Sequence, residues 1–247
     1  MANKPPTSKQ ERDSVEELVG LFVDNRDKVS LLMEQVLLPI RTGPLGKLIH
    51  SIRSRIKDPD SLRDKLLRKL EKAKAAETPF DITPSNFFEK INDLAGIRLL
   101  HLHTTQISEI NKILKGIVEE QRFGLIEGPV ARTWDDEYRD LFATLGIDTR
   151  SSPNMYTSVH YVLSSNSKSN YTCEVQVRTL MEEVWGEVDH SINYPHPMKD
   201  VACREQIRAL ARSTSSATRL VDSIFATVED VERRAHKSRK RESKGAD

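Results

Sequence analysis

The sequence has few of the residues that mark metal-binding, secreted or membrane proteins. Its 247 residues include two cysteines, Cys173 and Cys203. Without a C-x-x-C pair or a Cys/His ligand spacing, no zinc site is expected, and two isolated cysteines favour free thiols in a reducing compartment. No run of about 18 apolar residues is present, so we expect no membrane span.

An excess of charge of one sign is also absent. The chain has 38 Lys and Arg against 37 Asp and Glu, a net charge of +1. Bulk electrostatics therefore do not attract polyanions, and any phosphate binding must come from local clusters. The first residues, M-A-N-K-P-P-T-S-K, contain no apolar segment, so they do not resemble a signal peptide. Together these features favour a cytoplasmic protein without a membrane partner.

The pattern that is present indicates helices, then a mixed β core, then further helices. Apolar residues recur at helical spacing over residues 14–40, 45–57, 61–75, 105–120, 180–190 and 201–231. Strands are predicted at 96–102, 156–163 and 171–179. A polar linker joins the last two strands, which favours an antiparallel hairpin. The fold class is therefore α+β.

The segment R-I-K-D-P-D-S-L-R-D-K, residues 55–65, could bind an anion. Ser61 is placed at a helix N-cap, Lys65 follows one turn later, and Arg55 and Lys57 come just before the turn. A helix N-terminus favours negative charge, and nearby cations add to that. On spacing alone, a capped surface helix with solvated charges is the more common explanation.

The segment N-D-L-A-G-I-R, residues 92–98, places Asp93 at the beginning of a buried strand. A carboxylate there suits Mg²⁺, a hard cation that prefers oxygen ligands, and Gly96 permits a close backbone approach. The alternative is an Asp that caps a turn, and for this motif alone it is the better supported.

The two hairpin strands each have a polar face. These faces consist of Tyr156, Ser158 and His160 on one strand and Glu174, Gln176 and Arg178 on the other. If the strands pair, the two rows lie side by side as the floor of a cleft. Asp93 and Glu174, from separate strands, would then suit metal-assisted phosphoryl transfer. The alternative is a solvent-exposed face.

Taken together and in this order, these motifs, with W-G-E-V-D-H after them, resemble the synthetase domain of the RelA/SpoT family. The resemblance covers about residues 45–195. It implies a nucleotidyltransferase-like fold of the polymerase-β type, a mixed β-sheet flanked by helices. It also divides the chain into an N-terminal tail and helix (1–44), a synthetase domain (45–195), and C-terminal helices with a basic tail (196–247). No separate hydrolase domain is expected in this chain.

The resemblance implies transfer of the pyrophosphoryl group of ATP to the 3′-hydroxyl of GDP or GTP, with Mg²⁺, to make (p)ppGpp. The catalytic and metal-binding residues would be Asp93 and Glu174. The ATP-binding residues would be Arg55, Lys57, Ser61, Lys65 and Arg98. The acceptor-binding residues would be Asn154, Tyr156, Ser158, His160, Gln176 and Arg178. It also implies a homo-oligomer formed through the C-terminal helices, residues 200–235.

One departure from the family's motif leaves the identity of the acceptor substrate undecided. Family members that make (p)ppGpp usually have P-K-x-N-G-Y before the strand, whereas this chain has R-S-S-P-N-M-Y, with Met155 in place of the glycine. A second hypothesis is the same chemistry on an adenosine nucleotide or on the 3′ end of tRNA, as in growth-arresting toxins. The basic tail at 233–244 would suit RNA. A third hypothesis is a non-catalytic member that binds nucleotide or RNA.

Overall fold

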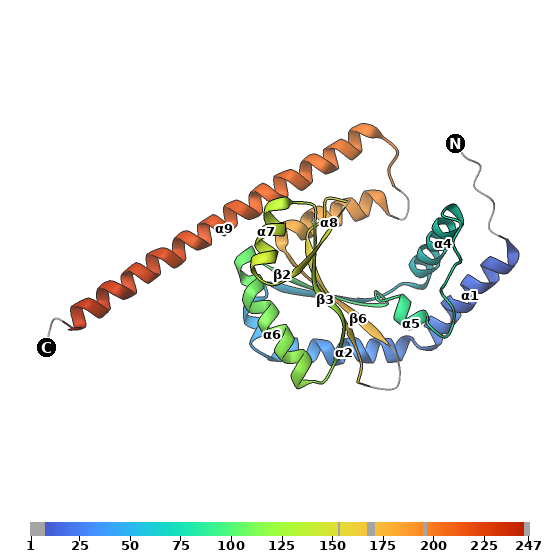
Figure 1. Ribbon diagram of the computed structural model, residues 1–247, viewed down its shortest axis with the longest axis horizontal. Coiled ribbons are helices and arrows are strands. Elements are labelled where there is room, and N and C mark those ends of the chain that lie inside the picture. Colours follow the sequence, from blue (N-terminus) through green and yellow to red (C-terminus); the bar gives the residue numbers. More distant parts are fainter. Residues whose placement is uncertain (1–7, 153, 167–170, 195–196, 245–247) are drawn as a thin grey trace.

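The chain forms a six-stranded mixed sheet within residues 8–152, 154–166, 171–194 and 197–244, which the computed structural model describes (Figure 1). The strands are β1 (Ser51–Ile56), β2 (Ala95–His101), β3 (Gly124–Thr133), β4 (Asp148–Ser151), β5 (Ser158–Ser164) and β6 (Thr172–Thr179). Their order is β1-β2-β6-β5-β3-β4, with β2/β6 and β3/β4 parallel and the other neighbours antiparallel. The expected α+β class and the hairpin of β5 and β6 are confirmed.

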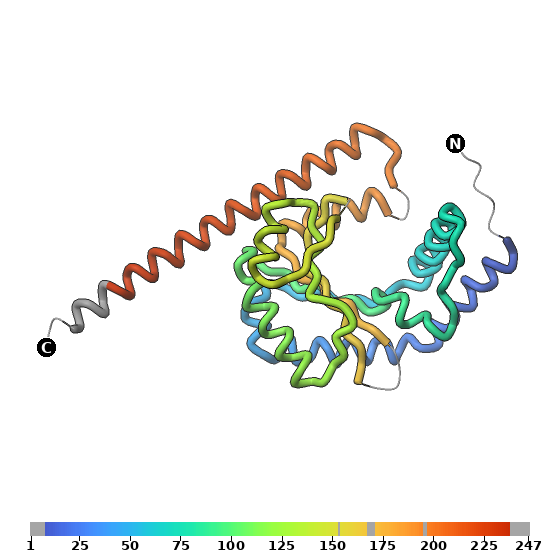
Figure 2. The backbone as a smooth tube through the Cα atoms, viewed as in Figure 1, coloured from blue at the N-terminus to red at the C-terminus, as the bar shows by residue number. Residues whose placement is uncertain are grey.

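Helices cover both faces of the sheet. They are α1 (Lys9–Asp24), α2 (Arg26–Thr42), α3 (Leu45–Leu48), α4 (Pro59–Ala75), α5 (Phe87–Lys90), α6 (Ile107–Glu120), α7 (Asp136–Thr144), α8 (Leu180–Asn193) and α9 (Val201–Lys244), with a short 3-10 turn at Thr104–Gln106. In Figure 1, α2 and α6 lie on one side of the sheet, and α8 and α9 lie on the other. Helices α1 and α4 pack against each other at the end of the molecule far from the C-terminal half of α9 (Figure 2).

The apolar side of the central strands forms the core. Alternate residues of β6, namely Cys173, Val175 and Val177, are 0–1% exposed and share one cluster with the buried stripe of α2. Burying each such aliphatic side chain contributes about 1.5–3 kcal/mol. The N-terminal helices therefore share a core with the sheet, while the domain division of the chain stays a prediction.

The opposite side of these strands has two polar rows that run across the sheet. Strand register places Arg53 beside Arg98, Arg98 beside Gln176, and Gln176 beside His160. In the next row, Arg55 pairs with Gly96, and Gly96 pairs with Glu174. Because α8 follows β6 directly and packs over these strands, the rows form the floor of a covered cleft and not an open solvent face.

Residues 45–57 depart from the expected helix. Only Leu45–Leu48 are helical, and Ser51–Ile56 form the edge strand β1. Apolar residues at 45, 48, 49, 52 and 56 fit helical spacing, but pairing with β2 overrides that local preference. As residues of a strand, Arg53 and Arg55 lie on the polar side of the sheet.

Two helix boundaries also differ from the expectation. Residues 14–40 form two helices that meet at Asn25, and Pro39 lies inside α2 near its end. The N-cap of α4 is Asp58, whose carboxylate accepts a hydrogen bond from the Ser61 amide at 3.0 Å. Ser61, the predicted cap, is therefore in the first turn of α4, and the observed cap lies three residues before it. Parts of the linker after β5, residues 167–170, lie outside the described residues.

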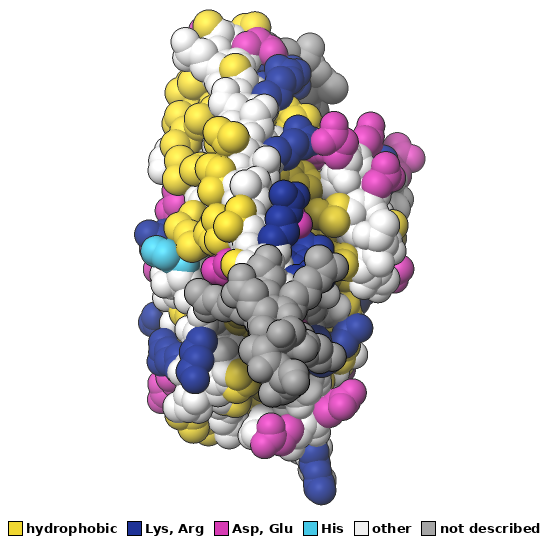
Figure 3. Space-filling model, turned by 90° about the vertical axis from the view of Figure 1, so that its left-hand side faces the viewer, with side chains coloured by type: hydrophobic (Ala, Val, Ile, Leu, Met, Phe, Trp, Pro, Cys, Tyr) yellow, Lys and Arg dark blue, Asp and Glu magenta, His cyan; other side chains and the backbone are white. Residues whose placement is uncertain are grey.

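Helix α9 is longer than predicted and only its first half packs on the core. The Trp185 indole donates to the Ile207 carbonyl at 3.1 Å, and Trp185 and Ile207 are buried together. Further along, Leu220, Ile224, Val228 and Val231 are 48–64% exposed and follow one face (Figure 3). Association through the C-terminal helices stays a prediction, and this stripe is the surface it would use. Among the described helices, none is both long and apolar enough to cross a bilayer.

Helix α4 ends in a Schellman motif in which a glutamate occupies the glycine position. Glu77 has φ of 53°, and the Thr78 amide donates to the Ala73 carbonyl at 2.9 Å. We expect Glu77→Gly to raise the free energy of unfolding by about 1 kcal/mol, because glycine adopts this conformation without strain. Glu77→Ala is the matched control and should stay within about 0.5 kcal/mol of wild type. Chemical denaturation would measure both, and equal stabilities of the two variants would contradict the assignment.

Candidate functional site

Asp93 binds two lysines at the beginning of β2. Lys57 Nζ lies 3.0 Å from Asp93 Oδ2, and Lys65 Nζ lies 2.6 Å from Asp93 Oδ1. Burial raises the pKa of Asp93, but the charges of Lys65 and Lys57 outweigh it and lower the pKa to about 2. The carboxylate is therefore ionised, and two cations meet on one anion. The extra positive charge can attract a phosphate.

These residues line a pocket of about 340 Å³, which we call the lysine pocket. Its lining residues are Arg55, Ile56, Lys57, Asp58, Ser61, Lys65, Arg68, Asp93, His190 and Tyr194. The N-terminal turn of α4 contributes Ser61 and its backbone N–H groups, which favour an anion. Four of the five predicted ATP-binding residues and Asp93 are brought together here.

The end of α8 forms one wall of the lysine pocket. The Tyr194 ring stacks on His190 at 4.6 Å, and the Arg68 guanidinium lies 5.0 Å from the Tyr194 ring centre. The Tyr194 hydroxyl donates to the Ser61 carbonyl at 3.2 Å. Arg68 and Tyr194 were missed by the sequence reasoning. Arg68 follows Lys65 by three residues on the same helix face, a signal that could have found it, whereas nothing in the sequence placed Tyr194 here.

Glu174 is the end of a hydrogen-bonded chain. Tyr156 Oη lies 2.6 Å from His160 Nε2, and His160 Nδ1 lies 2.9 Å from Glu174 Oε1. The Gln176 amide donates to Glu174 Oε2 at 2.8 Å. Burial raises the pKa of Glu174, but the His160 and Gln176 contacts outweigh it and lower the pKa. Glu174 is therefore an ionised carboxylate, and each of its oxygens retains acceptor capacity.

A second, wider pocket of about 690 Å³ lies on the other side of His190 and Tyr194. We call it the tyrosine pocket. Its polar and aromatic lining includes Arg98, Arg132, Asn154, Tyr156, Gln176, Arg178, Trp185, Asp189, His190, Tyr194, Arg204 and Arg208. The Arg178 guanidinium lies 5.8 Å from the centre of the Tyr156 ring. A Cβ at Gly186 would come within 2.8 Å of Arg178, so this glycine makes room for the guanidinium beside α8.

The predicted acceptor residues do not all reach the tyrosine pocket. Asn154, Tyr156, Gln176 and Arg178 line it, and His160 lies behind Tyr156. Ser158 is 1% exposed, and its hydroxyl donates to the Val177 carbonyl at 3.2 Å. Of the predicted ATP-binding residues, Arg98 lines this pocket and not the lysine pocket.

Met155 occupies a left-handed backbone conformation, with φ of 56°. This conformation is easily adopted by glycine and strained for most other residues. The glycine of the P-K-x-N-G-Y pattern therefore has a conformational explanation at this position. Here Met155 takes the same backbone conformation and packs against the Trp185 cluster.

Three arginines on the polar side of the sheet converge on two glutamates of α8. Arg53 NH1 and Arg98 NH1 each lie 3.1 Å from Glu183 Oε1, and Arg178 forms an ion pair with Glu183 Oε2. Glu187, one turn later, lies 2.5 Å from Arg98 and 3.6 Å from Arg53. We call these five residues the arginine cluster. These residues include three that were not predicted as site residues: Arg53 lies on β1, which was expected to be helical, and α8 gave no charge pattern that singled out Glu183 and Glu187.

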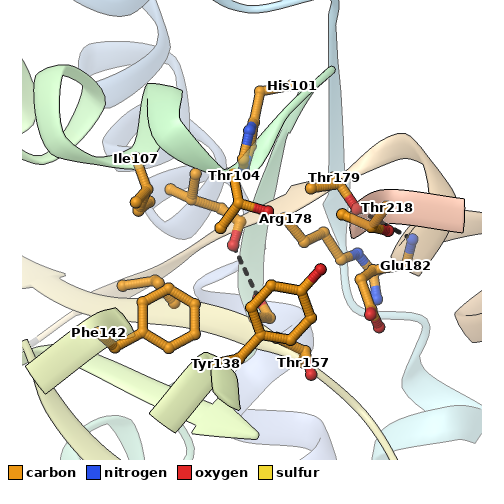
Figure 4. A pocket seen from close by; sticks show the side chains of 13 residues that line it. His101, Thr104, Ile107, Tyr138, Phe142, Thr157, Arg178, Thr179, Glu182 and Thr218 are labelled. Carbon is orange, nitrogen blue, oxygen red and sulfur yellow. Dashed lines mark hydrogen bonds between the residues drawn. The ribbon is translucent and has the colours of Figure 1, made fainter. Parts of the chain in front are cut away.

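A small cavity of about 20 Å³ lies beside Arg178 (Figure 4). Its polar lining comes from His101, Thr104, Tyr138, Thr157, Ser158, Arg178, Thr179, Glu182 and Thr218. The cavity is large enough for about one water molecule and too small for a nucleotide. Burial raises the pKa of Glu182 to about 7, while the Thr157 backbone and Arg178 oppose the shift and Asp135 adds to it.

The carboxylates fit one kind of metal ion. Among the described residues, no cluster of three or more His, Cys, Asp or Glu could hold a metal alone. Asp93 and Glu174 are ionised and close enough that Asp93 raises the pKa of Glu174. One or two carboxylates suit Mg²⁺, which completes its shell with waters and phosphate oxygens. They do not suit a structural zinc ion, which needs four protein ligands.

Comparison with known proteins identifies the family. Residues 54–199 match the family model described as "Region found in RelA / SpoT proteins". The match covers more than half of the chain, so the protein belongs to the RelA/SpoT synthetase family. The chain is 24% identical over 151 residues to the GTP pyrophosphokinase YwaC of Bacillus subtilis (strain 168). The aligned region spans 59% of this chain and 59% of that relative.

Solved structures show the same fold. Small alarmone synthetase 1 from Bacillus subtilis superposes with a TM-score of 0.57 at 20% identity, over 85% of this chain and 96% of that one. A GTP pyrophosphokinase family protein from Streptococcus pneumoniae gives 0.58 at 18% identity, over 87% and 95%. The mixed sheet flanked by helices is therefore that of small alarmone synthetases.

The raised pKa of Glu182 predicts that the stability of the protein depends on pH. Between about pH 4.5 and 7 the Glu182 carboxyl group loses its proton in the unfolded chain and keeps it in the folded protein. The free energy of unfolding therefore falls as pH rises, by up to about 3 kcal/mol. Glu182→Gln should remove this loss, so that the variant gains on wild type between about pH 5 and pH 8. The buried His101 titrates in the opposite sense, so the measurement compares variants and not absolute curves.

Chemical denaturation of wild type, Glu182→Gln and the exposed control Glu120→Gln across this pH range would measure the effect. Parallel stability profiles for wild type and Glu182→Gln would show that Glu182 does not retain its proton.

Proposed function

We propose that the protein is an ATP-dependent pyrophosphokinase that transfers the pyrophosphoryl group of ATP to the 3′-hydroxyl of GDP or GTP. The observation that carries this proposal is the meeting of the two pockets. The lysine pocket and the tyrosine pocket share His190 and Tyr194, and the carboxylates Asp93 and Glu174 are close enough to interact electrostatically. Asp93 lines the lysine pocket, and Glu174 accepts a hydrogen bond from Gln176, which lines the tyrosine pocket. Two neighbouring pockets of nucleotide size with an ionised carboxylate at each suit phosphoryl transfer between two nucleotides.

In this proposal the lysine pocket holds ATP. Lys57, Ser61, Lys65 and Arg68 supply positive charge and donors for the phosphates, at the N-terminal turn of α4. The gap above Gly96 lies between Arg55 on the neighbouring strand and Arg98 two residues along. A planar adenine would fit between two guanidinium groups there, since Arg stacks on aromatic rings. A structure of the Bacillus subtilis small alarmone synthetase 1 is bound to AMPCPP, an ATP analogue, which supports ATP as one of the two substrates.

The tyrosine pocket would hold the acceptor. Tyr156 offers a ring on which a base can stack, and Asn154 and Gln176 offer polar contacts to it. Arg204 and Arg208 from α9 line the same pocket and would pair with the 5′-phosphates. A structure of the same Bacillus subtilis protein is bound to its product pppGpp, which supports a guanosine nucleotide here.

Glu174 would accept the proton of the attacking hydroxyl. The 3′-oxygen forms a bond to the β-phosphorus of ATP, the bond from that phosphorus to the α,β-bridging oxygen breaks, and AMP leaves with that oxygen. The hydroxyl proton passes to Glu174, whose orientation is fixed by His160 and Gln176. The Tyr156 hydroxyl is hydrogen-bonded to His160, and it thereby connects the acceptor pocket to Glu174, the proposed proton acceptor. Positioning of both substrates then supplies most of the rate.

Asp93 and Glu174 would also hold Mg²⁺. When bound, the ion would neutralise charge on the phosphates and polarise the bond that breaks. Lys57 and Lys65 each pair with one Asp93 oxygen, so binding of Mg²⁺ and ATP would redirect these lysines from Asp93 to the phosphates.

The acceptor can be tested by incubating the protein with γ-labelled ATP, Mg²⁺ and, separately, GDP, GTP, ATP or tRNA. We expect label on GDP and GTP. Label on an adenosine nucleotide or tRNA alone would replace the guanosine acceptor with the second hypothesis. Transfer to none of them would leave a nucleotide-binding, non-catalytic protein.

Glu174→Gln tests the proposed proton acceptor. The variant keeps the size of the side chain and removes its charge, so we expect kcat to fall by about 10²–10⁴-fold. The folded state and the affinity for an ATP analogue should change much less. Glu120→Gln, an exposed change on α6, is the control. A Glu174→Gln enzyme with turnover near wild type would contradict the assignment.

A further inference from the structure

The arginine cluster connects parts of the cleft that the two proposed substrates would use. Arg53, Arg98 and Arg178 come from β1, β2 and β6, three neighbouring strands, and all reach the same side of the sheet. Glu183 contacts all three, with Oε1 shared between Arg53 and Arg98 and Oε2 facing Arg178. One carboxylate therefore fixes guanidinium groups from the three strands.

Burial makes Glu183 different from its neighbour Glu187. The Glu183 side chain is 7% exposed and that of Arg178 is 3%, whereas Glu187 is 47% exposed. A desolvated ion pair has few alternative partners, so its geometry is fixed, whereas an exposed pair can be replaced by water. Glu187 contacts Arg98 and Arg53 but is not among the ion-pair partners of Arg178 in the described chain.

The cluster also leaves positive charge available. Three guanidinium groups meet two carboxylates, so one positive charge remains uncompensated inside the cluster. Arg98 and Arg178 both line the tyrosine pocket, and Arg98 borders the gap above Gly96. Glu183 thus holds two ligand-facing arginines in place without neutralising the site.

We propose that Glu183 is a positioning residue that sets Arg98 and Arg178 together and so couples the ATP side of the cleft to the acceptor side. This inference rests on the proposed function for the identity of the two ligands. Glu183 does not touch either substrate. It acts through the two arginines, and of these two Glu187 contacts Arg98 alone among the ion pairs of the described residues.

The test measures binding and turnover for Glu183→Gln, Glu183→Asp, Glu187→Gln and the exposed control Glu120→Gln. Calorimetry gives the Kd for AMPCPP, and steady-state rates give KM for ATP and for the acceptor. Thermal unfolding checks that each variant is folded. Glu183→Asp retains the negative charge with a shorter side chain, so it keeps the inference testable where the glutamine variant does not fold.

We expect Glu183→Gln to raise the Kd for AMPCPP and both KM values by about tenfold, because the ion pair with Arg98 and the ion pair with Arg178 are both lost. Glu183→Asp should recover part of each loss. Glu187→Gln should raise the AMPCPP Kd and the ATP KM by about threefold and change the acceptor KM less than Glu183→Gln does, since it contacts Arg98 but leaves the ion pair of Arg178 in place.

A lower melting temperature of Glu183→Gln with unchanged Kd and KM values would overturn the inference and leave Glu183 a structural residue. Equal effects of Glu183→Gln and Glu187→Gln on both KM values would overturn the coupling. Failure of the proposed function has a different signature, because wild type would then transfer label to no acceptor. In that case the AMPCPP affinities of the Glu183 variants still decide whether Glu183 positions Arg98.

Discussion

Charged side chains on a sheet face that a helix covers need partners of opposite charge, and this requirement organises the whole cleft. The polar rows of β1, β2, β6 and β5 lie beneath α8, so each buried charge has a counterion close by. Lys57 and Lys65 meet on Asp93, and three arginines meet on Glu183. Removing one partner of such a pair costs about 3–5 kcal/mol, which keeps these groups in one geometry before any ligand binds.

The pairing of these charged side chains also allows the site to bind anionic ligands. Each cluster holds more cations than anions, so phosphates can join it without an unpaired charge being created. Strand register then determines which clusters are neighbours. Because Gly96 pairs with both Arg55 and Glu174, the proposed adenine gap lies directly beside the proposed proton acceptor. The local geometry of the sheet, more than any single motif, brings the two substrates of the proposed reaction together.

Much of this arrangement could be predicted from the sequence, because strand alternation determines which residues share a face. The polar row Glu174, Gln176 and Arg178 and its neighbour strand were found in that way. Strand β1 was mistaken for a helix, since an edge strand with apolar residues three and four apart gives the wrong period. Tyr194 and Glu183 could not be found, because their roles depend on how α8 lies over the sheet, and no local pattern encodes that.

We propose that the two pockets together transfer a pyrophosphoryl group and not a single phosphate. ³¹P NMR of a mixture of the protein, Mg²⁺, ATP and GDP would test it most directly, because it identifies the bond that breaks. We expect AMP to form in equal amount with a 3′-pyrophosphorylated guanosine nucleotide. Formation of ADP in its place, or of AMP with free pyrophosphate and no modified acceptor, would contradict it.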